Sequence, residues 1–188
     1  LHKGNREKRL TELLDLAALG TVADMVPLVG ENRYLAKEGL KGLNNTHRIG
    51  LQEMIKLAGL KPGKLDVKSI SETLGPCLNV ASKRDDASIS YQLLTTHSLK
   101  EAHVLAVEIE HENAERQRLA AQVLSKAKER LAYRAPLLIA GDESYPVGVI
   151  GLVAGKLVDE FYKPAIIISL DPELCRGSCR SIPEFDII

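Results

Sequence analysis

An isolated acidic residue in an apolar stretch is the first candidate for chemistry in this sequence. Asp24 is the only charged residue between Thr21 and Val29. Burying an ionised carboxylate costs several kcal/mol unless the group is paired, hydrogen-bonded or bound to a metal ion. Two interpretations follow: Asp24 caps a helix or turn, or it is a metal ligand. The residues alone favour the cap slightly.

A hydroxyl and a guanidinium lie two residues apart near the end of the chain. We expect a strand over 176–181, in which Ser178 and Arg180 point to one face and Cys179 to the other. An arginine can bind two phosphate oxygens at once, and a hydroxyl beside it adds a further donor. The pair therefore indicates a phosphate site, and an ordinary edge strand is the alternative.

Two adjacent basic residues, Lys83 and Arg84, offer a second place where a phosphate could bind. Asp85 and Asp86 follow them directly. The alternative is therefore that the four charges pair with one another on a solvated surface.

The composition excludes several classes of protein. The net charge is zero, so any nucleic-acid site must be local. With five Tyr, two Phe and no Trp, a base-stacking platform is not favoured.

The three cysteines have no framework spacing, which indicates reduced thiols, and Cys175 and Cys179 lack a second Cys or His pair for a zinc site. Without a signal peptide or long apolar span, we expect a cytoplasmic protein that makes no membrane contact.

One long helix is expected to connect these groups. Ser98 and Glu101 have the spacing of a capping box and Pro136 ends the run, so the helix would span 98–135, roughly 55 Å. Both ends carry apolar stripes, whereas 110–118 is polar all round. This pattern predicts two ends buried in different cores and joined across water. The alternative, a bundle or coiled coil, is disfavoured because the heptad is not kept.

The two halves of the chain differ in kind. Before the long helix the pattern predicts only helices, over 5–19 (ended by Gly20), 30–42, 50–60, 66–74 (ended by Gly75-Pro76) and 87–96. After it, an apolar run, a helix and a second apolar run predict a βαβ unit with parallel strands, over 137–140, 148–161 and 164–170. The expected fold class is therefore α/β.

Several stretches follow one another in an order that is specific as a series. They are 16–28 with 30–33, then 74–88, then 148–157, 163–164 and 177–186. Together they resemble the RecJ-type exonucleases of the DHH phosphoesterase superfamily. The resemblance implies the C-terminal part of a DHH catalytic domain over 1–97, a connecting helix over 98–135, and a truncated DHH-associated domain over 136–188.

This resemblance implies a function. The family members are 5′→3′ exonucleases that hydrolyse single-stranded DNA with two Mn²⁺ or Mg²⁺ ions, in DNA repair and recombination. Single-strand-binding protein and repair helicases are the partners implied. Asp24 would be a metal ligand, and Ser178 and Arg180 would hold the terminal 5′ phosphate. The other DNA-binding positions implied are Asn79, Lys83, Arg84 and Gly177.

The sequence departs from the family in three places. The paired-Asp and Asp-His-His motifs are absent, and since one carboxylate cannot hold two hard cations, we expect this chain alone to be inactive. Tyr145 and Pro146 stand where the family has Trp-His. Ser82-Lys83 replaces Gly-Arg, and lysine loses the bidentate geometry of arginine. Two alternatives stay open: a DHH phosphodiesterase for short oligonucleotides, and a catalytically dead nucleic-acid-binding homologue.

Overall fold

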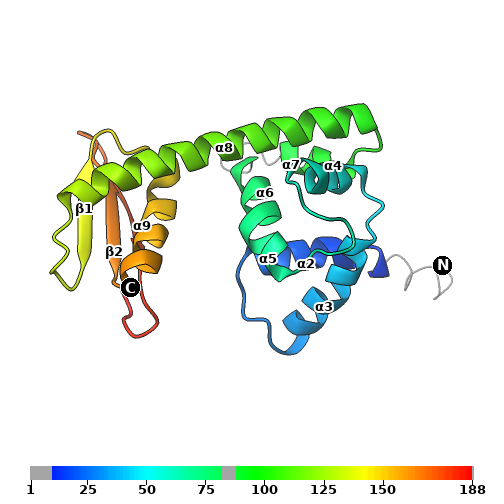
Figure 1. Cartoon of the computed structure of the whole chain (residues 1–188), viewed down its shortest axis with the longest axis horizontal. Helices are drawn as coiled ribbons and strands as arrows, with labels where there is room; N and C mark the ends of the chain where they lie inside the picture. Colours follow the sequence, from blue (N-terminus) through cyan, green and yellow to red (C-terminus); the bar gives the residue numbers. More distant parts are fainter. Residues whose placement is uncertain (1–9, 82–87, 188) are drawn as a thin grey trace. The chain divides into compact units, whose positions relative to one another are not determined.

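The structure, a computed structural model, describes residues 10–81 and 88–187 and combines helices with one small sheet (Figure 1). The expected α/β class is therefore confirmed. Lys83 and Arg84 lie outside the described residues. No described helix has the length and apolarity that a membrane span needs.

Two compact units make up the chain, Leu1–Asn113 and Ala114–Ile188. The boundary between them falls within one long helix, α8 (Leu99–Arg130). The assignment of residues 1–97 to a DHH catalytic domain and of 136–188 to a DHH-associated domain stays a prediction, because compactness alone does not identify a domain family.

The first unit is all-helical in the part that the structure describes, as predicted. Its elements are α2 (Leu14–Ala23), α3 (Gly30–Asn44), α4 (Ile49–Leu57), α5 (Val67–Ser69), the π-helix η1 (Ile70–Leu74), α6 (Gly75–Ala81), α7 (Ser88–Thr95) and the first part of α8. Helices α2 and α3 touch through Gly39. A Cβ at this position would stand 2.1 Å from the Leu14 carbonyl oxygen and 2.4 Å from Ala18 Cβ. The contact therefore requires glycine.

Helix α2 does not stop at Gly20, so the predicted end of the first helix is wrong. It continues to Ala23, and Asp24 is its C-cap. A glycine inside a helix costs only about 1 kcal/mol relative to alanine. Continuing the helix places Val22 in the core, and this burial outweighs the cost.

The helix predicted over 66–74 does not end at Gly75-Pro76 either. Asp66 caps α5, which widens into η1 and runs on into α6. Proline has no N–H, and in a regular α-helix its ring clashes with the carbonyl one turn earlier. The wider π turn, in which the Gly75 amide donates to the Ile70 carbonyl, makes room for the Pro76 ring. The chain therefore passes through the proline as a helix.

The start of α8 uses the predicted capping residues in a modified way. Ser98 Oγ accepts the Glu101 amide at 3.3 Å, as a capping box requires. The Glu101 carboxylate instead accepts the Thr96 hydroxyl, and the Ser98 amide donates to Thr96 Oγ1 at 3.1 Å. The capping arrangement therefore involves Thr96 in addition to the two residues, Ser98 and Glu101, that the sequence predicted.

The far end of α8 comes earlier than predicted, at Arg130 and not at Ala135. The Tyr133 hydroxyl donates to the Lys128 carbonyl at 2.6 Å. Lys163 Nζ donates to the carbonyl oxygens of Tyr133 and Ala135 at 2.7 and 3.1 Å. The first bond satisfies a carbonyl in the last turn of α8, and the other two hold the turn that follows the helix before Pro136.

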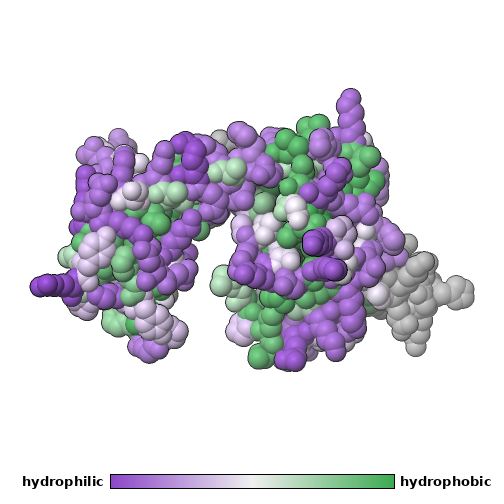
Figure 2. All heavy atoms as spheres, viewed as in Figure 1, coloured by the Kyte–Doolittle hydropathy of each residue, from purple (hydrophilic) through white to green (hydrophobic). Residues whose placement is uncertain are grey.

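The two ends of α8 lie in separate cores, as predicted. Figure 2 shows mostly hydrophilic side chains over the middle of the helix. The buried helix residues are Ala102, Leu105, Ala106 and Ile109 in the first core and Ala120, Val123 and Ala127 in the second. A single continuous apolar face, the bundle alternative, is therefore not what the described residues form.

The second unit contains the predicted βαβ arrangement. Its elements after α8 are β1 (Leu138–Asp142), α9 (Val147–Phe161), β2 (Ala165–Ser169) and β3 (Arg176–Arg180). Strands β1 and β2 are parallel, with Leu138 opposite Ala165. Strand β3 is antiparallel to β2 and lies at the edge, in the order β1-β2-β3. Helix α9 buries Val153 and Leu157 against the sheet face that contains Ile167.

The close contact at Gly39 can be tested by substitution. We expect Gly39→Ala to lower the free energy of unfolding of the first unit by about 3 kcal/mol, because backbone atoms must move to admit the methyl group. Gly20→Ala is the matched control: it adds the same methyl group to α2, where nothing lies within 4 Å. That variant should be as stable as the parent or more stable by up to about 1 kcal/mol. Urea unfolding followed by circular dichroism measures both, and equal stability of the two variants would contradict the packing described.

Candidate functional site

Asp24 lies exposed at the C-terminal end of α2. Its amide donates to the Gly20 carbonyl at 3.0 Å, so the backbone closes the helix. Its carboxylate makes no hydrogen bond or ion pair with any residue that the structure describes. The side chain is therefore exposed, although its apolar neighbours in the sequence suggested burial. It does not cap the helix, because only the backbone of Asp24 makes the capping bond.

The position of Asp24 is unfavourable for a carboxylate that has no partner. The C-terminal end of a helix carries partial negative charge, which disfavours an acidic group there by about 0.3–1 kcal/mol. The next residue, Met25, adopts a left-handed backbone with φ 55° and is 84% exposed. That conformation costs a residue with a Cβ about 1–2 kcal/mol. Two locally unfavourable choices side by side are typical of functional positions, and a cation bound to Asp24 would offset the first.

The described residues offer one carboxylate at this place and no complete metal site. Within residues 10–81 and 88–187, no three His, Cys, Asp or Glu side chains come together in a way that could hold a metal ion. Mn²⁺ and Mg²⁺ prefer oxygen ligands, which the Asp24 carboxylate provides. Asp24 therefore fits as one ligand of such an ion, whose other ligands would lie outside the described residues.

Ser178 and Arg180 lie on the same face of β3, as predicted. Both face α9 at Gly151: a Cβ there would stand 3.1 Å from Ser178 Oγ and 3.5 Å from Arg180 Nη2. Cys179 pairs with Ile166 and points to the other face. The absence of a side chain at Gly151 therefore leaves room for the hydroxyl and the guanidinium to lie side by side.

The donors of this pair are mostly free. Arg180 Nη1 donates to the Cys179 carbonyl at 2.8 Å, and no described carboxylate pairs with the guanidinium. The Ser178 hydroxyl makes no hydrogen bond with a described residue. Free hydroxyl and guanidinium donors at one place are suited to binding a phosphate. Gly177 pairs with Ile168 and lies on the opposite face, where a Cβ would meet only ordinary contacts at 3.8 Å or more.

The other residues that the sequence analysis singled out add little to the candidate site in the described structure. Asn79 is exposed on α6, and Lys83 and Arg84 lie outside the described residues. Tyr145 is 1% exposed, burial raises the pKa of its hydroxyl, and the buried oxygen has no partner within the described structure. Pro146 is the N-cap of α9. The two residues at the Trp-His position therefore serve the core and the start of a helix.

Sequence reasoning missed an arginine in the polar middle of α8. Arg116 Nε donates to the Gly148 carbonyl of α9 at 3.4 Å, and burial lowers the pKa of its guanidinium. Arg118, two residues later, is exposed and binds both oxygens of Glu115 at 2.7 Å. Nothing in the sequence distinguishes these two arginines, since both lie in a segment that reads as solvent-exposed.

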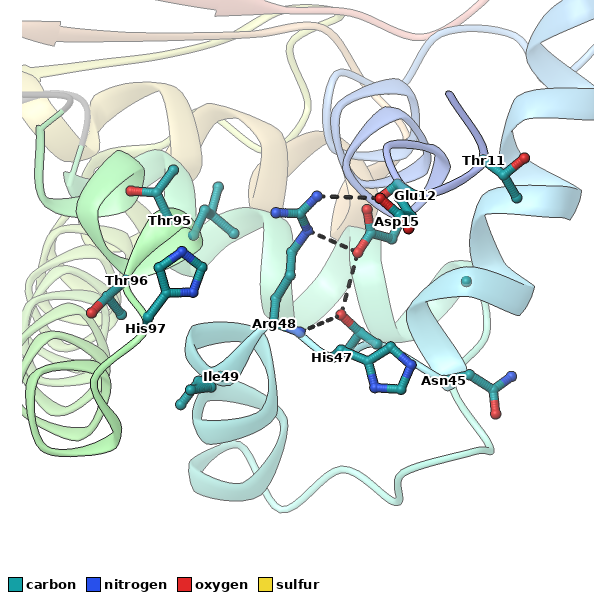
Figure 3. A pocket seen from close by; sticks show the side chains of 13 residues that line it. Thr11, Glu12, Asp15, Asn45, His47, Arg48, Ile49, Thr95, Thr96 and His97 are labelled. Carbon is teal, nitrogen blue, oxygen red and sulfur yellow. Dashed lines mark hydrogen bonds and ion pairs between the residues drawn. The ribbon is translucent and has the colours of Figure 1, made fainter. Parts of the chain in front are cut away.

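A cavity of about 420 Å³ in the first unit is built around an ion pair that sequence reasoning also missed (Figure 3). Asp15 Oδ2 accepts Arg48 Nε at 3.0 Å and Thr46 Oγ1 at 3.3 Å. Arg48 Nη2 also donates to the Glu12 carbonyl at 3.2 Å. The Asp15 side chain is only 8% exposed. The pair joins α2 to the segment between α3 and α4, and none of the predicted site residues lines the cavity.

Comparison with known proteins identifies the chain. It is 40% identical over 181 residues to the single-stranded-DNA-specific exonuclease RecJ of Bacillus subtilis and 31% identical over 188 residues to that of Haemophilus influenzae, each match covering 94% of this chain. The chain is a RecJ-type sequence. It spans 23% of the first relative and 32% of the second, so most of each relative lies outside the match. No family model matches the chain.

Solved structures give the same result. The structure of RecJ in complex with Mg²⁺ from Thermus thermophilus is similar with a TM-score of 0.81 and 30% identity, over 92% of this chain and 27% of that one. An exonuclease RecJ bound to manganese is similar with a TM-score of 0.74 and 29% identity, over 94% of this chain and 44% of that one. The RecJ-type fold therefore extends over both units.

The unfavourable position of the Asp24 charge at the C-terminal end of α2 predicts that its removal stabilises the fold. Asp24→Asn removes a charge from the negative end of α2, so we expect the free energy of unfolding to rise by about 0.5 kcal/mol. Glu31→Gln is the matched control, because Glu31 lies in the first turn of α3, where a negative charge is favourable. That variant should lose a similar amount. Urea unfolding in low salt measures both, and destabilisation by Asp24→Asn would show that the carboxylate has a structural role.

Proposed function

We propose that the whole protein containing this chain is a 5′→3′ exonuclease that hydrolyses single-stranded DNA with Mn²⁺ or Mg²⁺ in DNA repair and recombination. The observation that supports it most is the pair of Ser178 and Arg180, which lie side by side against Gly151 with most of their donors unused by described residues. Its position in a RecJ-type sequence supports it further. The described chain contains one candidate metal ligand, so it is expected to be inactive by itself.

The role proposed for Asp24 is to hold a metal ion. Its carboxylate oxygens are exposed and have no partner within the described structure. Bound Mn²⁺ or Mg²⁺ supplies Lewis-acid activation for hydrolysis of a phosphodiester. The closing turn of α2 fixes the direction in which the carboxylate leaves the helix, because the Asp24 and Met25 amides donate to the Gly20 and Val22 carbonyls.

The role proposed for Ser178 and Arg180 is to recognise the end of the strand. A terminal phosphate has more free oxygens and more negative charge than an internucleotide phosphate, so it can accept both the hydroxyl and the guanidinium. Binding the 5′ end at β3 would set the direction of degradation. Asn79, Lys83 and Arg84 stay predictions as further DNA contacts, and so do a cytoplasmic location and the partnership with single-strand-binding protein and repair helicases.

One observation favours a second candidate, a catalytically dead homologue that only binds nucleic acid. Pro146 stands where RecJ-type sequences have a His, and as the α9 N-cap it has no group that could move a proton or bind a metal. A whole protein that binds single strands but releases no nucleotide with either metal would favour this candidate over the exonuclease.

The nuclease proposal is tested with two variants of the whole protein. We expect Asp24→Asn to abolish Mn²⁺-dependent nucleotide release from single strands, whether they carry a 5′ phosphate or a 5′ hydroxyl. Arg180→Gln should lower the ratio of kcat/KM for 5′-phosphate over 5′-hydroxyl substrate by about tenfold to a hundredfold, because hydrogen bonds to a charged group are worth about 1.5–3 kcal/mol.

Each proposed role is contradicted by a different experimental result. Full activity of Asp24→Asn would remove the metal role. An unchanged substrate ratio in Arg180→Gln would remove the end-recognition role. Degradation limited to strands of a few nucleotides would support the short-oligonucleotide phosphodiesterase instead.

A further inference from the structure

Arg116 is a half-buried cation that forms no ion pair with a carboxylate in the described part of the chain. It extends from α8 to α9, where its Nε donates to the Gly148 carbonyl. Among residues 10–81 and 88–187 no acidic group forms an ion pair with it, whereas Arg118 on the same helix pairs with Glu115. A partly desolvated charge without an ionic partner is unfavourable, and a bound anion would offset that cost.

The bond to Gly148 fixes the guanidinium in a useful orientation. Since Nε is used by the backbone carbonyl, Nη1 and Nη2 keep their donors for an oxyanion. Lys156, which is on α9 itself, is less available for an oxyanion because its Nζ donates to Gln117 Oε1 at 3.2 Å. Among the described residues, Arg116 therefore offers a fork of guanidinium donors beside Gly148 of α9.

The surface of α9 between Arg116 and β3 is open. Gly148 and Gly155 have nothing within 4 Å of the place of a Cβ, and Gly151 has only the Ser178 and Arg180 side chains near it. Gly148 and Gly151 are about 5 Å apart along the helix axis. Arg116 at Gly148 and the Ser178–Arg180 pair at Gly151 are therefore separated along α9 by a distance on the order of one nucleotide step, and neither glycine has a side chain.

We propose that Arg116 binds the internucleotide phosphate that follows the terminal phosphate held by Ser178 and Arg180, so that a nucleic-acid strand passes over the glycine surface of α9. The inference rests on the proposed function of Ser178 and Arg180. It adds a second phosphate position, specific for a phosphodiester chain and indifferent to the chemistry of the 5′ end.

The test is equilibrium binding of fluorescent single-stranded oligonucleotides to the whole protein without divalent metal, so that no strand is cleaved. We expect Arg116→Gln to weaken binding about tenfold for both 5′-phosphate and 5′-hydroxyl strands. The slope of log K against log salt should fall by about 0.7, the value for one lost contact with a single strand. Arg118→Gln, the matched control, should change neither quantity. Arg116→Lys should restore the slope and recover only part of the affinity, because it keeps the charge without the fork.

The outcomes separate this inference from the function it rests on. An Arg116→Gln variant with unchanged slope and affinity would overturn the second phosphate position. A loss confined to 5′-phosphate strands would also overturn it, since Arg116 would then belong to the terminal site. Arg180→Gln in the same assay reports on the terminal site alone: if it loses the preference for 5′-phosphate strands while Arg116→Gln behaves as the parent, the proposed function stands and the inference fails.

Discussion

One continuous helix that enters two cores is the constraint on which the rest of this structure depends. Alanines on α8 are fully buried in both, Ala102 in the first and Ala120 and Ala127 in the second. Their small side chains allow other elements to approach the helix closely. Each unit is therefore completed by its own part of α8. The polar middle of α8 contributes no residue to either core, and Arg116 from that segment can reach the backbone of α9.

The candidate residues differ in how the fold holds them. Ser178 and Arg180 are positioned by strand alternation and by the missing side chain at Gly151, so the fold places both on the face of β3 toward α9. Asp24 is held by the closing turn of a helix at a place where its charge is unfavourable and its neighbour is strained. A cation bound to the exposed Asp24 carboxylate would offset its unfavourable position, which is consistent with the metal role proposed for this residue.

Much of the second unit could be predicted because its signals are local. Two apolar runs flanking an amphipathic helix predicted the parallel pair, and alternation predicted the shared face of Ser178 and Arg180. The two buried ends of α8 followed from its apolar stripes. Each of these depends on periodicity over a few turns or one strand, which can be recognised without knowledge of distant contacts.

The sequence-based predictions were wrong or incomplete where contacts between residues far apart in the sequence determine the structure. Gly20 and Pro76 are residues that usually end helices, but core burial extends α2 past Gly20, and the π turn of η1 lets the chain continue as α6 through Pro76. The ion pair of Asp15 with Arg48 joins residues 33 positions apart, and Arg116 is set apart from Arg118 only by the helix that packs beside it. Asp24 was expected to be buried among apolar neighbours, and only the structure shows it exposed. Such features have no periodic signal in a single sequence.

The central claim is that Asp24 binds a metal ion, and calorimetric titration of Mn²⁺ into the whole protein without DNA tests it most directly. The account predicts that Asp24→Asn weakens Mn²⁺ binding by about tenfold or more, as expected for loss of a ligand, whereas Arg180→Gln binds the ion as the parent does. An Asp24→Asn protein whose binding isotherm matches that of the parent would contradict the claim.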